Sequence, residues 1–297
     1  MINRKHTNTV NKLKKRLSDY WELTKPGVTF MVIISTLGGF YLGANSPLNF
    51  ALLFHTLLGS WLVAGGTNAL NQLIERDIDA TMKRTQKRPL PDGRLSVAEV
   101  RIFAISISVF GIAYLLVAVN LLTGALAALT LTSYVFVYTP LKRKTTLSTV
   151  IGAVPGALPA LGGWTAVRGD LSPEGWILFS ILFFWQLPHF LAIALIYRED
   201  YARGGFKVLP VMDKTGTATG FHIIVNCLAL LSVSLLPTLV GLTGTVYFVG
   251  ALVLGIVFLV SGVRVAVQKS TRCARQLLHA SIIYLPILFT LIFIDRM

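Results

Sequence analysis

Three oxygen-bearing side chains recur at four-residue spacing where a long apolar stretch ends: Asn71, Glu75 and Asp79. If that stretch continues as a helix, four residues advance about 400°, so the side chains drift by only about 40° per step and share one face. Asp77 points away from this face. Oxygen ligands suit a hard cation such as Mg²⁺, which often binds through a few carboxylates together with substrate phosphates. The spacing therefore predicts a metal site built from all three side chains.

A cluster of cations directly follows these three side chains, which together are called the row. Four of them fall within six positions: Lys83, Arg84, Lys87 and Arg88. An Arg guanidinium matches phosphate oxygens two at a time, and carboxylates near the C-terminal end of a helix need a compensating positive charge. Together the row and the cluster predict a metal-bridged diphosphate site at a membrane surface. The alternative for any single Lys or Arg is a basic loop that only fixes membrane topology.

Two further polar segments could complete such a site. Tyr138, Lys142 and Arg143 follow another apolar stretch and could close one side of a phosphate pocket. His189 lies inside a later apolar stretch, and Asp200 lies at the end of that stretch. Ionisable groups in or near a membrane span are costly and tend to be functional. For His189 the alternative is a hydrogen bond between two helices.

The elements that must position these residues are membrane helices. Apolar residues make up 54% of the chain and charged residues only 13%, whereas a soluble protein usually carries about 25% charged residues. So few charges could not cover the surface of a globular protein of 297 residues. We therefore expect an all-α, polytopic membrane protein.

Nine apolar segments are long enough to cross a bilayer, which takes about 20 residues. They lie near 26–43, 50–74, 98–119, 121–139, 147–167, 175–197, 219–240, 243–265 and 276–294. The fifth is rich in Gly and Pro, which allow close helix packing or a broken helix. We expect residues 1–18 to form a polar, mobile, basic tail and residues 19–297 a single domain of nine transmembrane helices.

The positive charges alternate between the two ends of these segments. One side holds 25 of the 27 Lys and Arg residues, and the other holds only Arg168 and Arg296. The positive-inside rule then places the N-terminus in the cytoplasm and the C-terminus outside. The net charge of +14 is therefore explained by topology. Because nothing in the sequence resembles a nucleic-acid-binding module, we expect no nucleic-acid partner.

Three blocks of sequence carry a family resemblance: "NALNQLIERDIDATMKRTQKRPLP", "YTPLKRKTTLSTVIGAVPGALPALGGW" and "WQLPHFLAIALIYREDYARGGFKVLPV". They resemble the haem O synthase (protohaem IX farnesyltransferase) branch of the UbiA-type intramembrane prenyltransferases, and the similarity spans roughly residues 20–295. The resemblance implies a nine-helix bundle around a cavity that opens to lipid, with the active site on the cytoplasmic side. It also implies transfer of a farnesyl group from farnesyl diphosphate to a vinyl group of haem B, with water addition, giving haem O and diphosphate.

The resemblance also implies where the catalytic residues lie. In the wider superfamily the first motif is Asn-x3-Asp-x3-Asp, and a second motif, Asp-x3-Asp, follows helix six. Here Glu75 takes the middle position of the first motif, as in the haem branch, and Asp200 has no acidic residue four positions away. Two full Mg²⁺ sites therefore cannot be carried over. We expect Asn71, Glu75, Asp79 and Asp200 to be catalytic.

Further binding roles follow from the same resemblance. The residues expected to bind diphosphate are Arg84, Lys87, Arg88, Lys142, Arg143, Arg203 and Lys207. Those expected to bind the haem and prenyl groups are Tyr138, Phe184, Trp185, Gln186, His189 and Tyr201. The expected cofactor is Mg²⁺, and the expected partners are haem B, farnesyl diphosphate and membrane lipid, with a haem A-forming enzyme or a haem-copper oxidase receiving the product. The expected location is the cell (plasma) membrane, or an energy-transducing organelle membrane in a eukaryote.

Three other functions stay open. A sister prenyltransferase acting on a quinone precursor or chlorophyllide would carry the same first motif. A transporter or channel would need charged groups near the midplane, on a path that reaches both faces, whereas the polar groups here cluster on one side. A protein that only handles haem during assembly, and catalyses no reaction, would have no use for the row of oxygen ligands.

Overall fold

The computed structural model describes residues 2–44 and 47–297, and most of them are helical. The elements in chain order are α1 (Ile2–Leu23), α2 (Pro26–Gly43), α3 (Phe50–Asp79), α4 (Val97–Ala118), α5 (Leu121–Thr132), η1 (Ser133–Tyr138), α6 (Thr139–Leu141), α7 (Ser148–Arg168), α8 (Pro173–Ile196), α9 (Arg198–Arg203), α10 (Leu209–Met212), α11 (Thr217–Leu239), α12 (Thr245–Gln268) and α13 (Thr271–Asp295). The predicted all-α class is confirmed.

Nine helical segments within the described ranges are long and apolar enough to cross a membrane. They match the nine predicted segments one to one, and the fourth runs unbroken through α5, η1 and α6 (Leu121–Leu141). Two helices extend five residues beyond the predicted segments: α3 continues to Asp79 past residue 74, and α13 begins at Thr271 before residue 276. At 1.5 Å per residue, the 30 residues of α3 span about 45 Å, which exceeds the roughly 30 Å apolar core of a bilayer. The last turns of α3 therefore rise above the apolar layer.

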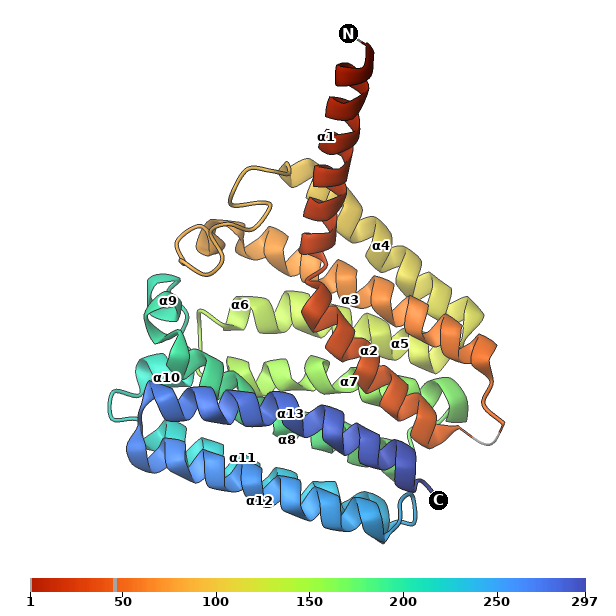
Figure 1. The fold of residues 1–297 in the computed structure, drawn as a ribbon, viewed down its shortest axis with the longest axis vertical. Coiled ribbons are helices and arrows are strands. Elements are labelled where there is room, and N and C mark those ends of the chain that lie inside the picture. Colours follow the sequence, from red (N-terminus) through yellow and green to blue (C-terminus); the bar gives the residue numbers. More distant parts are fainter. Residues whose placement is uncertain (1, 45–46) are drawn as a thin grey trace.

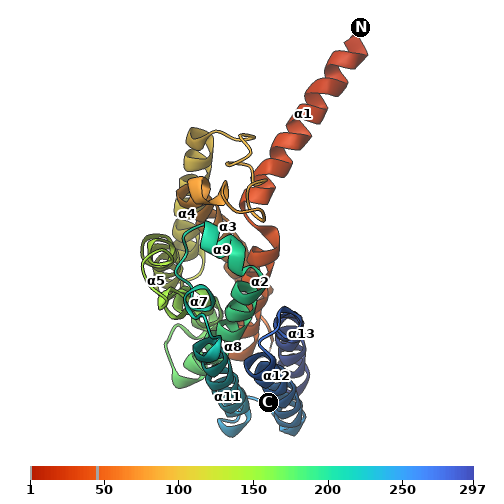
Figure 2. The ribbon, with the colours of Figure 1, turned by 90° about the vertical axis from the view of Figure 1, so that its left-hand side faces the viewer.

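The N-terminal segment, which we expect to be a mobile tail as far as residue 18, forms the helix α1 from Ile2 to Leu23. In Figure 1 the spans run broadly from left to right, whereas α1 runs upward across them. Figure 2 shows α1 extending away from the bundle. Its direction changes sharply at the junction with α2, so α1 is not an extension of the first span.

The bundle encloses a central space between two groups of helices. Helix α2 packs on α7 and α3 packs on α4, while α8 packs on α7, α11 and α13. Helix α12 closes the far side by packing on α11 and α13. The ends of α3 and α8, together with α9 and α10, gather on one side of the molecule, at the left in Figure 1. This arrangement brings the polar segments of the sequence to one end of the bundle.

The predicted break near Asn120 is confirmed. The Asn120 side chain caps α5, because its Oδ1 accepts a hydrogen bond from the Thr123 N–H at 2.8 Å. Its Nδ2 donates to the Thr165 carbonyl at 2.8 Å. One side chain therefore both starts α5 and ties the turn to the end of α7.

Glycines allow α2 and α7 to approach closely. A Cβ at Gly39 would overlap the Ala160 carbonyl oxygen, and a Cβ at Gly163 would overlap the Thr36 carbonyl oxygen. Small residues at such contacts are typical of membrane helix packing. Although α7 contains Pro155 and Pro159, it is described as one helix. Of the two alternatives for this segment, close packing is the one observed.

A pair of neighbouring glycines offers a test of this packing. We expect Gly163→Ala to lower stability by about 1–3 kcal/mol, because the new methyl group meets backbone rather than a movable side chain. The measurement is the midpoint of thermal unfolding of the detergent-purified protein. The matched control is Gly162→Ala, since a Cβ at Gly162 would meet nothing within 4 Å. Equal midpoints for the two variants would contradict the close approach of α2 and α7.

Candidate active site

The predicted row of oxygen ligands lies on one face of α3. Asn71, Glu75 and Asp79 are buried, with 1%, 5% and 1% of their surface exposed. By contrast, the Asp77 side chain is 83% exposed. Asn71 Nδ2 donates to Glu75 Oε2 at 3.0 Å. The helix thus continues through the row and turns its polar face inward, as the spacing predicted.

Three cations lie against the row, one for each of its members. They come from three separate segments: the start of α2, the turn after α6 and the loop after α3. The contacts are Lys25 Nζ to Asn71 Oδ1 at 2.7 Å, Lys142 Nζ to Glu75 Oε1 at 2.8 Å, and Arg88 Nη1 to Asp79 Oδ2 at 2.6 Å. Buried carboxylates are tolerated when they are paired in this way. The tertiary fold therefore supplies the compensating charge that the position of the row requires.

Lys25 is a site residue that sequence analysis missed. Its backbone is left-handed, with φ at 47°, a conformation that costs a non-glycine residue of order 1–3 kcal/mol and that clusters at functional sites. Helix α3 holds this junction in place. Gln72 Nε2 donates to the Leu23 carbonyl at 2.9 Å, and Asn68 Nδ2 donates to the Thr24 carbonyl at 3.2 Å. The polar face of α3 therefore both carries the row and fixes the cation beside it.

A sequence signal for Lys25 did exist. It directly precedes Pro26, which begins α2, and a cation at the N-terminal end of a helix opposes the helix dipole. A lysine in so unfavourable a place is a candidate for function. Burial, reinforced by the positive charges of Arg88 and Lys142, lowers the pKa of Lys25 to about 7.

The fourth span contains a π-helix, η1, near its end, and Tyr138 and Thr139 lie where η1 meets α6. Single π-turns occur often at functional sites. Thr139 Oγ1 accepts a hydrogen bond from Asn71 Nδ2 at 3.3 Å, and Lys142 Nζ lies 4.6 Å from the centroid of the Tyr138 ring. Burial alone would lower the pKa of Lys142, but Tyr138 and Glu75 hold it above its ordinary value. Lys142 therefore keeps its charge.

Asp200, which is expected to be catalytic, lies apart from the row and has other partners. Its carboxylate accepts hydrogen bonds from the backbone N–H groups of Lys83 at 3.4 Å and Arg84 at 3.3 Å, and it pairs with Arg203. The Arg84 guanidinium in turn lies 5.6 Å from the centroid of the Tyr201 ring. These hydrogen bonds hold the cation-rich loop after α3 against α9.

The remaining predicted diphosphate ligands, the rim cations, are exposed. They are Arg84, Lys87, Arg143, Arg203 and Lys207. In the described part of the chain none of them bonds to the row, which is contacted instead by Lys25, Arg88 and Lys142. The Lys207 N–H donates to the Lys142 carbonyl at 2.8 Å. This hydrogen bond links the backbone of one rim cation to the backbone of Lys142.

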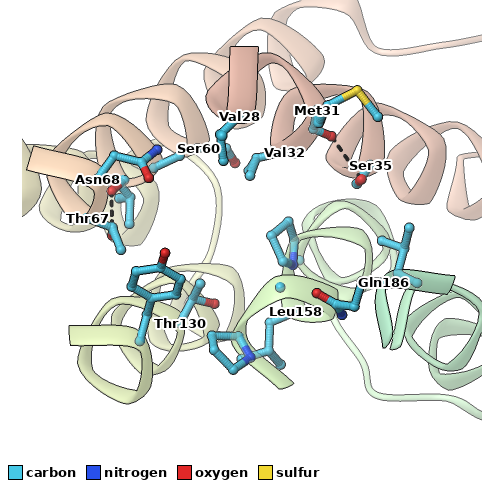
Figure 3. A pocket seen from close by; sticks show the side chains of 18 of the residues that line it. Val28, Met31, Val32, Ser35, Ser60, Thr67, Asn68, Thr130, Leu158 and Gln186 are labelled. Carbon is cyan, nitrogen blue, oxygen red and sulfur yellow. Dashed lines mark hydrogen bonds between the residues drawn. The ribbon is translucent and has the colours of Figure 1, made fainter. Parts of the chain in front are cut away.

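An apolar cavity of about 420 Å³ lies between α2, α3, α5, η1, α7 and α8. Lys25 and Asn68 lie in its wall together with many apolar side chains. Figure 3 shows Val28 and Val32 of α2 across the space from Leu158 of α7. Its volume falls in the range of about 300–1,000 Å³ that is typical of small-molecule sites. The shared residue Lys25 joins this cavity to the row.

Of the six residues predicted to bind the haem and prenyl groups, the structure places four in the cavity wall: Tyr138, Trp185, Gln186 and His189. The other two lie elsewhere. Phe184 packs against the hydrophobic core and meets Phe183 edge-on. Tyr201 lies against Arg84 and Phe206. Phe184 and Tyr201 are not among the residues that line this cavity, and their binding of the haem and prenyl groups stays a prediction.

The hydrogen bonds around His189 fix its orientation. Ser281 Oγ donates to the Leu278 carbonyl at 2.6 Å, so this hydroxyl can only accept from its second partner, His189 Nδ1, at 2.7 Å. The proton of the neutral imidazole is then on Nδ1. The ring is also stacked on Trp185, with centroids 4.9 Å apart. His189 thus carries its free lone pair on Nε2.

A sequence model of the UbiA prenyltransferase family matches residues 32–283, which is most of the chain. The chain belongs to the UbiA prenyltransferase family. The match includes the whole row on α3, Lys142 and the segment of α8 that carries His189. It confirms the family resemblance of the three sequence blocks. It also confirms that this is an integral, multi-pass membrane protein.

Known members of the UbiA family are similar over almost the full length of the chain. The protoheme IX farnesyltransferase of Solibacter usitatus is 45% identical, and the alignment covers 94% of this chain and 99% of that protein. The relative of the same name in Aquifex aeolicus is 40% identical over 94% of this chain and 95% of that protein. These similarities confirm the prediction that the chain belongs to the haem-farnesylating branch of the family.

A solved structure shares the fold at low identity. A digeranylgeranylglyceryl phosphate synthase superposes with a TM-score of 0.79 at 16% identity, covering 94% of this chain and 98% of that one. The predicted nine-helix bundle is therefore a UbiA-type fold.

The row offers a plausible ligand set for a metal in this UbiA-family chain. Asp79 Oδ1 is buried and has no hydrogen-bond partner in the structure, which leaves one carboxylate oxygen open. All the available donors are oxygens, as Mg²⁺ prefers. Within the described residues, however, no three His, Cys, Asp or Glu side chains converge on one point. The residues fit a metal that is held by Glu75, Asp79 and Asn71 and completed by the substrate.

Proposed function

We propose that the chain transfers a farnesyl group from farnesyl diphosphate to a vinyl group of haem B, with addition of water, giving haem O and diphosphate. The observation that carries the proposal is the buried row with its three cations at the wall of an apolar cavity. The 45% identity to a protoheme IX farnesyltransferase over 94% of the chain supports this choice of donor and acceptor.

Mg²⁺ is the proposed cofactor. A UbiA homologue from Archaeoglobus fulgidus has been solved with GPP and Mg²⁺ bound, and it superposes on this chain with a TM-score of 0.66 at 16% identity. In the present chain Glu75, Asp79 and Asn71 would hold the ion. When bound, it would act as a Lewis acid on the phosphate oxygens.

The reaction begins when the allylic C–O bond of farnesyl diphosphate breaks and diphosphate leaves with the electron pair. Arg88 and Lys142 neutralise the charge that develops on the leaving group, and such fixed charges in a site with little water are often the largest single contribution to catalysis. The rim cations Arg84 and Arg143 are placed to assist. The Tyr138 ring, beside Lys142, and Trp185 in the cavity wall present aromatic faces to the allylic cation.

The vinyl group of haem then supplies the electrons for the new carbon–carbon bond. The positive charge moves to the former vinyl carbon, where water adds its oxygen and loses a proton. We propose that His189 contacts the haem through Nε2. Because this nitrogen carries a lone pair and no proton, it suits the haem iron better than a propionate oxygen, which would require a donor.

The lipid setting suits both substrates, since a prenyl chain and a flat macrocycle partition into a bilayer. The charge pattern supports a chain in the cell membrane with its N-terminus in the cytoplasm and its C-terminus outside. The row and its cations then face the cytoplasm. A haem A-forming enzyme or a haem-copper oxidase is the proposed recipient of the product.

Product analysis tests the proposal. Membranes that carry the protein are incubated with haem B, farnesyl diphosphate and Mg²⁺, and the extracted haems are analysed by chromatography and mass spectrometry. We expect a new haem whose mass has increased by one farnesyl group plus one water, and we expect EDTA to prevent its formation. Unmodified haem B from protein that is folded and in the membrane would overturn the choice of acceptor, and a quinone precursor would be tested next.

A further inference from the structure

Helix α1 leaves the bundle with one of its faces uncovered. It turns away from the spans, as Figure 1 and Figure 2 both show. Because the bundle is embedded in a bilayer and the spans cross it, a helix that runs across the spans lies along the membrane surface. It lies at the end of the bundle where Lys25 meets the row.

One face of α1 is attached to the protein. Arg16 pairs with Glu99 at the start of α4, and Asp19 pairs with Arg94 in the loop before it. Tyr20 packs on a ring of α4, with centroids 4.9 Å apart. At 100° per residue, Arg16, Asp19 and Tyr20 lie within an arc of about 100°. This contact fixes how α1 is rotated about its own axis.

A second face of α1 is apolar and exposed. Leu13, Leu17 and Trp21 follow one another at four-residue spacing, with 60%, 61% and 52% of their surface exposed. They form a stripe that drifts by about 40° per step. Trp21 stacks on Trp61 of the membrane-spanning α3, with centroids 5.6 Å apart. The stripe is therefore continuous with the lipid-facing surface of the bundle.

The third face of α1 is polar. Lys15, Ser18 and Glu22 are exposed and lie between about 140° and 200° from Leu13 around the helix axis. Lys14, also exposed, lies at about 100°, on the border between the stripe and the polar face. An amphipathic helix with lysine at such a border is typical of one that rests in the headgroup layer of a membrane. The segment from Met1 to Arg16 holds six Lys or Arg residues and no acidic residue.

We infer that α1 binds the surface of the bilayer that surrounds the bundle. Leu13, Leu17 and Trp21 enter the acyl-chain boundary, and Lys14 on its border binds anionic phospholipid headgroups. The occupant is lipid because the stripe joins the lipid-facing surface at Trp61 and because its border is positively charged. This inference concerns the membrane contact alone and does not depend on which substrate the enzyme uses.

Spin labels in the full-length protein test the apolar stripe. In a background with Cys227→Ala and Cys273→Ala, Leu17→Cys and Ser18→Cys are labelled separately and reconstituted in vesicles of phosphatidylcholine and phosphatidylglycerol. We expect the label at position 17 to collide mainly with oxygen, which concentrates in lipid. The label at position 18 should collide mainly with a water-soluble nickel complex. Two labels equally open to the nickel complex would overturn the inference.

Charge removal tests the headgroup contact. A lysine near an anionic surface contributes about 1 kcal/mol, which changes a partition equilibrium by roughly fivefold. Lys14→Gln should lower the ratio of lipid-inserted to aqueous label at position 17 by about this factor in anionic vesicles. The matched control is Lys214→Gln, which removes one exposed charge outside α1 and should leave the ratio unchanged. The headgroup assignment fails if the ratio is the same in anionic vesicles and in vesicles of phosphatidylcholine alone.

Discussion

Asp79→Asn should lower the rate of haem farnesylation by on the order of 10³-fold. The substitution keeps the shape of the side chain but removes the negative charge and replaces one ligand oxygen with an amide. Asp79 has 1% of its surface exposed, and its Oδ1 has no partner in the structure, so no neighbouring group replaces it as a ligand. The measurement is the initial rate of product formation in membranes at equal amounts of protein.

A matched control lies two residues away. Asp77→Asn makes the same chemical change on the same helix, but the Asp77 side chain is 83% exposed and points away from the row. Its activity should stay within about twofold of the parent, since surface substitutions away from special features have small effects. An Asp79→Asn enzyme that keeps more than a tenth of the parent activity would remove Asp79 from the metal site.

Lys142→Met should have the second-largest effect, a loss of roughly 10²–10³-fold in kcat together with a lower midpoint of thermal unfolding. Methionine keeps the length of the side chain without its charge. The leaving diphosphate then loses an ammonium group. In addition, the Glu75 carboxylate, 6% exposed as a side chain, loses its ion pair, and breaking a buried pair typically costs about 3–5 kcal/mol. Steady-state kinetics and thermal unfolding in detergent measure the two effects.

Lys144→Met serves as the control for Lys142, because it removes a neighbouring lysine whose side chain is exposed. Lys142→Arg should restore much of the stability but less of the rate. A guanidinium can pair with Glu75, whereas its planar shape differs from the compact ammonium that lies against the Tyr138 ring. If Lys142→Met lowered stability while kcat stayed at the parent value, Lys142 would be a structural residue only.

The spans were predictable because bilayer thickness dictates their length and composition. Even the break at Asn120 was visible, since a capping residue separates two apolar runs. Helix α3 extends past the apolar segment that ends at residue 74, because apolar composition marks where the membrane ends, whereas the helix continues as long as its polar residues find partners. Asn71 and Glu75 find theirs in Lys25 and Lys142.

The candidate site was predictable where its residues share one helix. Spacing alone placed Asn71, Glu75 and Asp79 together, because four residues return to nearly the same face. The same rule explains why Trp185 lines the cavity and Phe184 does not, since adjacent residues of a helix point about 100° apart. Contacts between different helices could not be predicted from the spacing of residues in the sequence.

Asp200 and Lys25 show the same limit of prediction from sequence, because the partners of each residue lie far from it in the chain. No local pattern reveals that the Asp200 carboxylate accepts from the backbone N–H groups of Lys83 and Arg84. Nor does any local pattern reveal that Lys25 reaches a residue 46 positions later. These contacts exist only once the helices have packed.

The pairing of the row with its cations has a consequence for the order in which ligands enter. Lys142 and Arg88 already neutralise Glu75 and Asp79. A metal ion that arrived alone would have to displace Lys142 and Arg88, which would then have no anion to pair with. A diphosphate that arrived alone would draw these two cations away and leave the buried Glu75 and Asp79 carboxylates facing its own negative charge. A complex of metal and diphosphate satisfies both sets in a single exchange of partners. If the chain binds Mg²⁺ and farnesyl diphosphate as proposed, the site would admit the two ions as a pair and reject either one on its own.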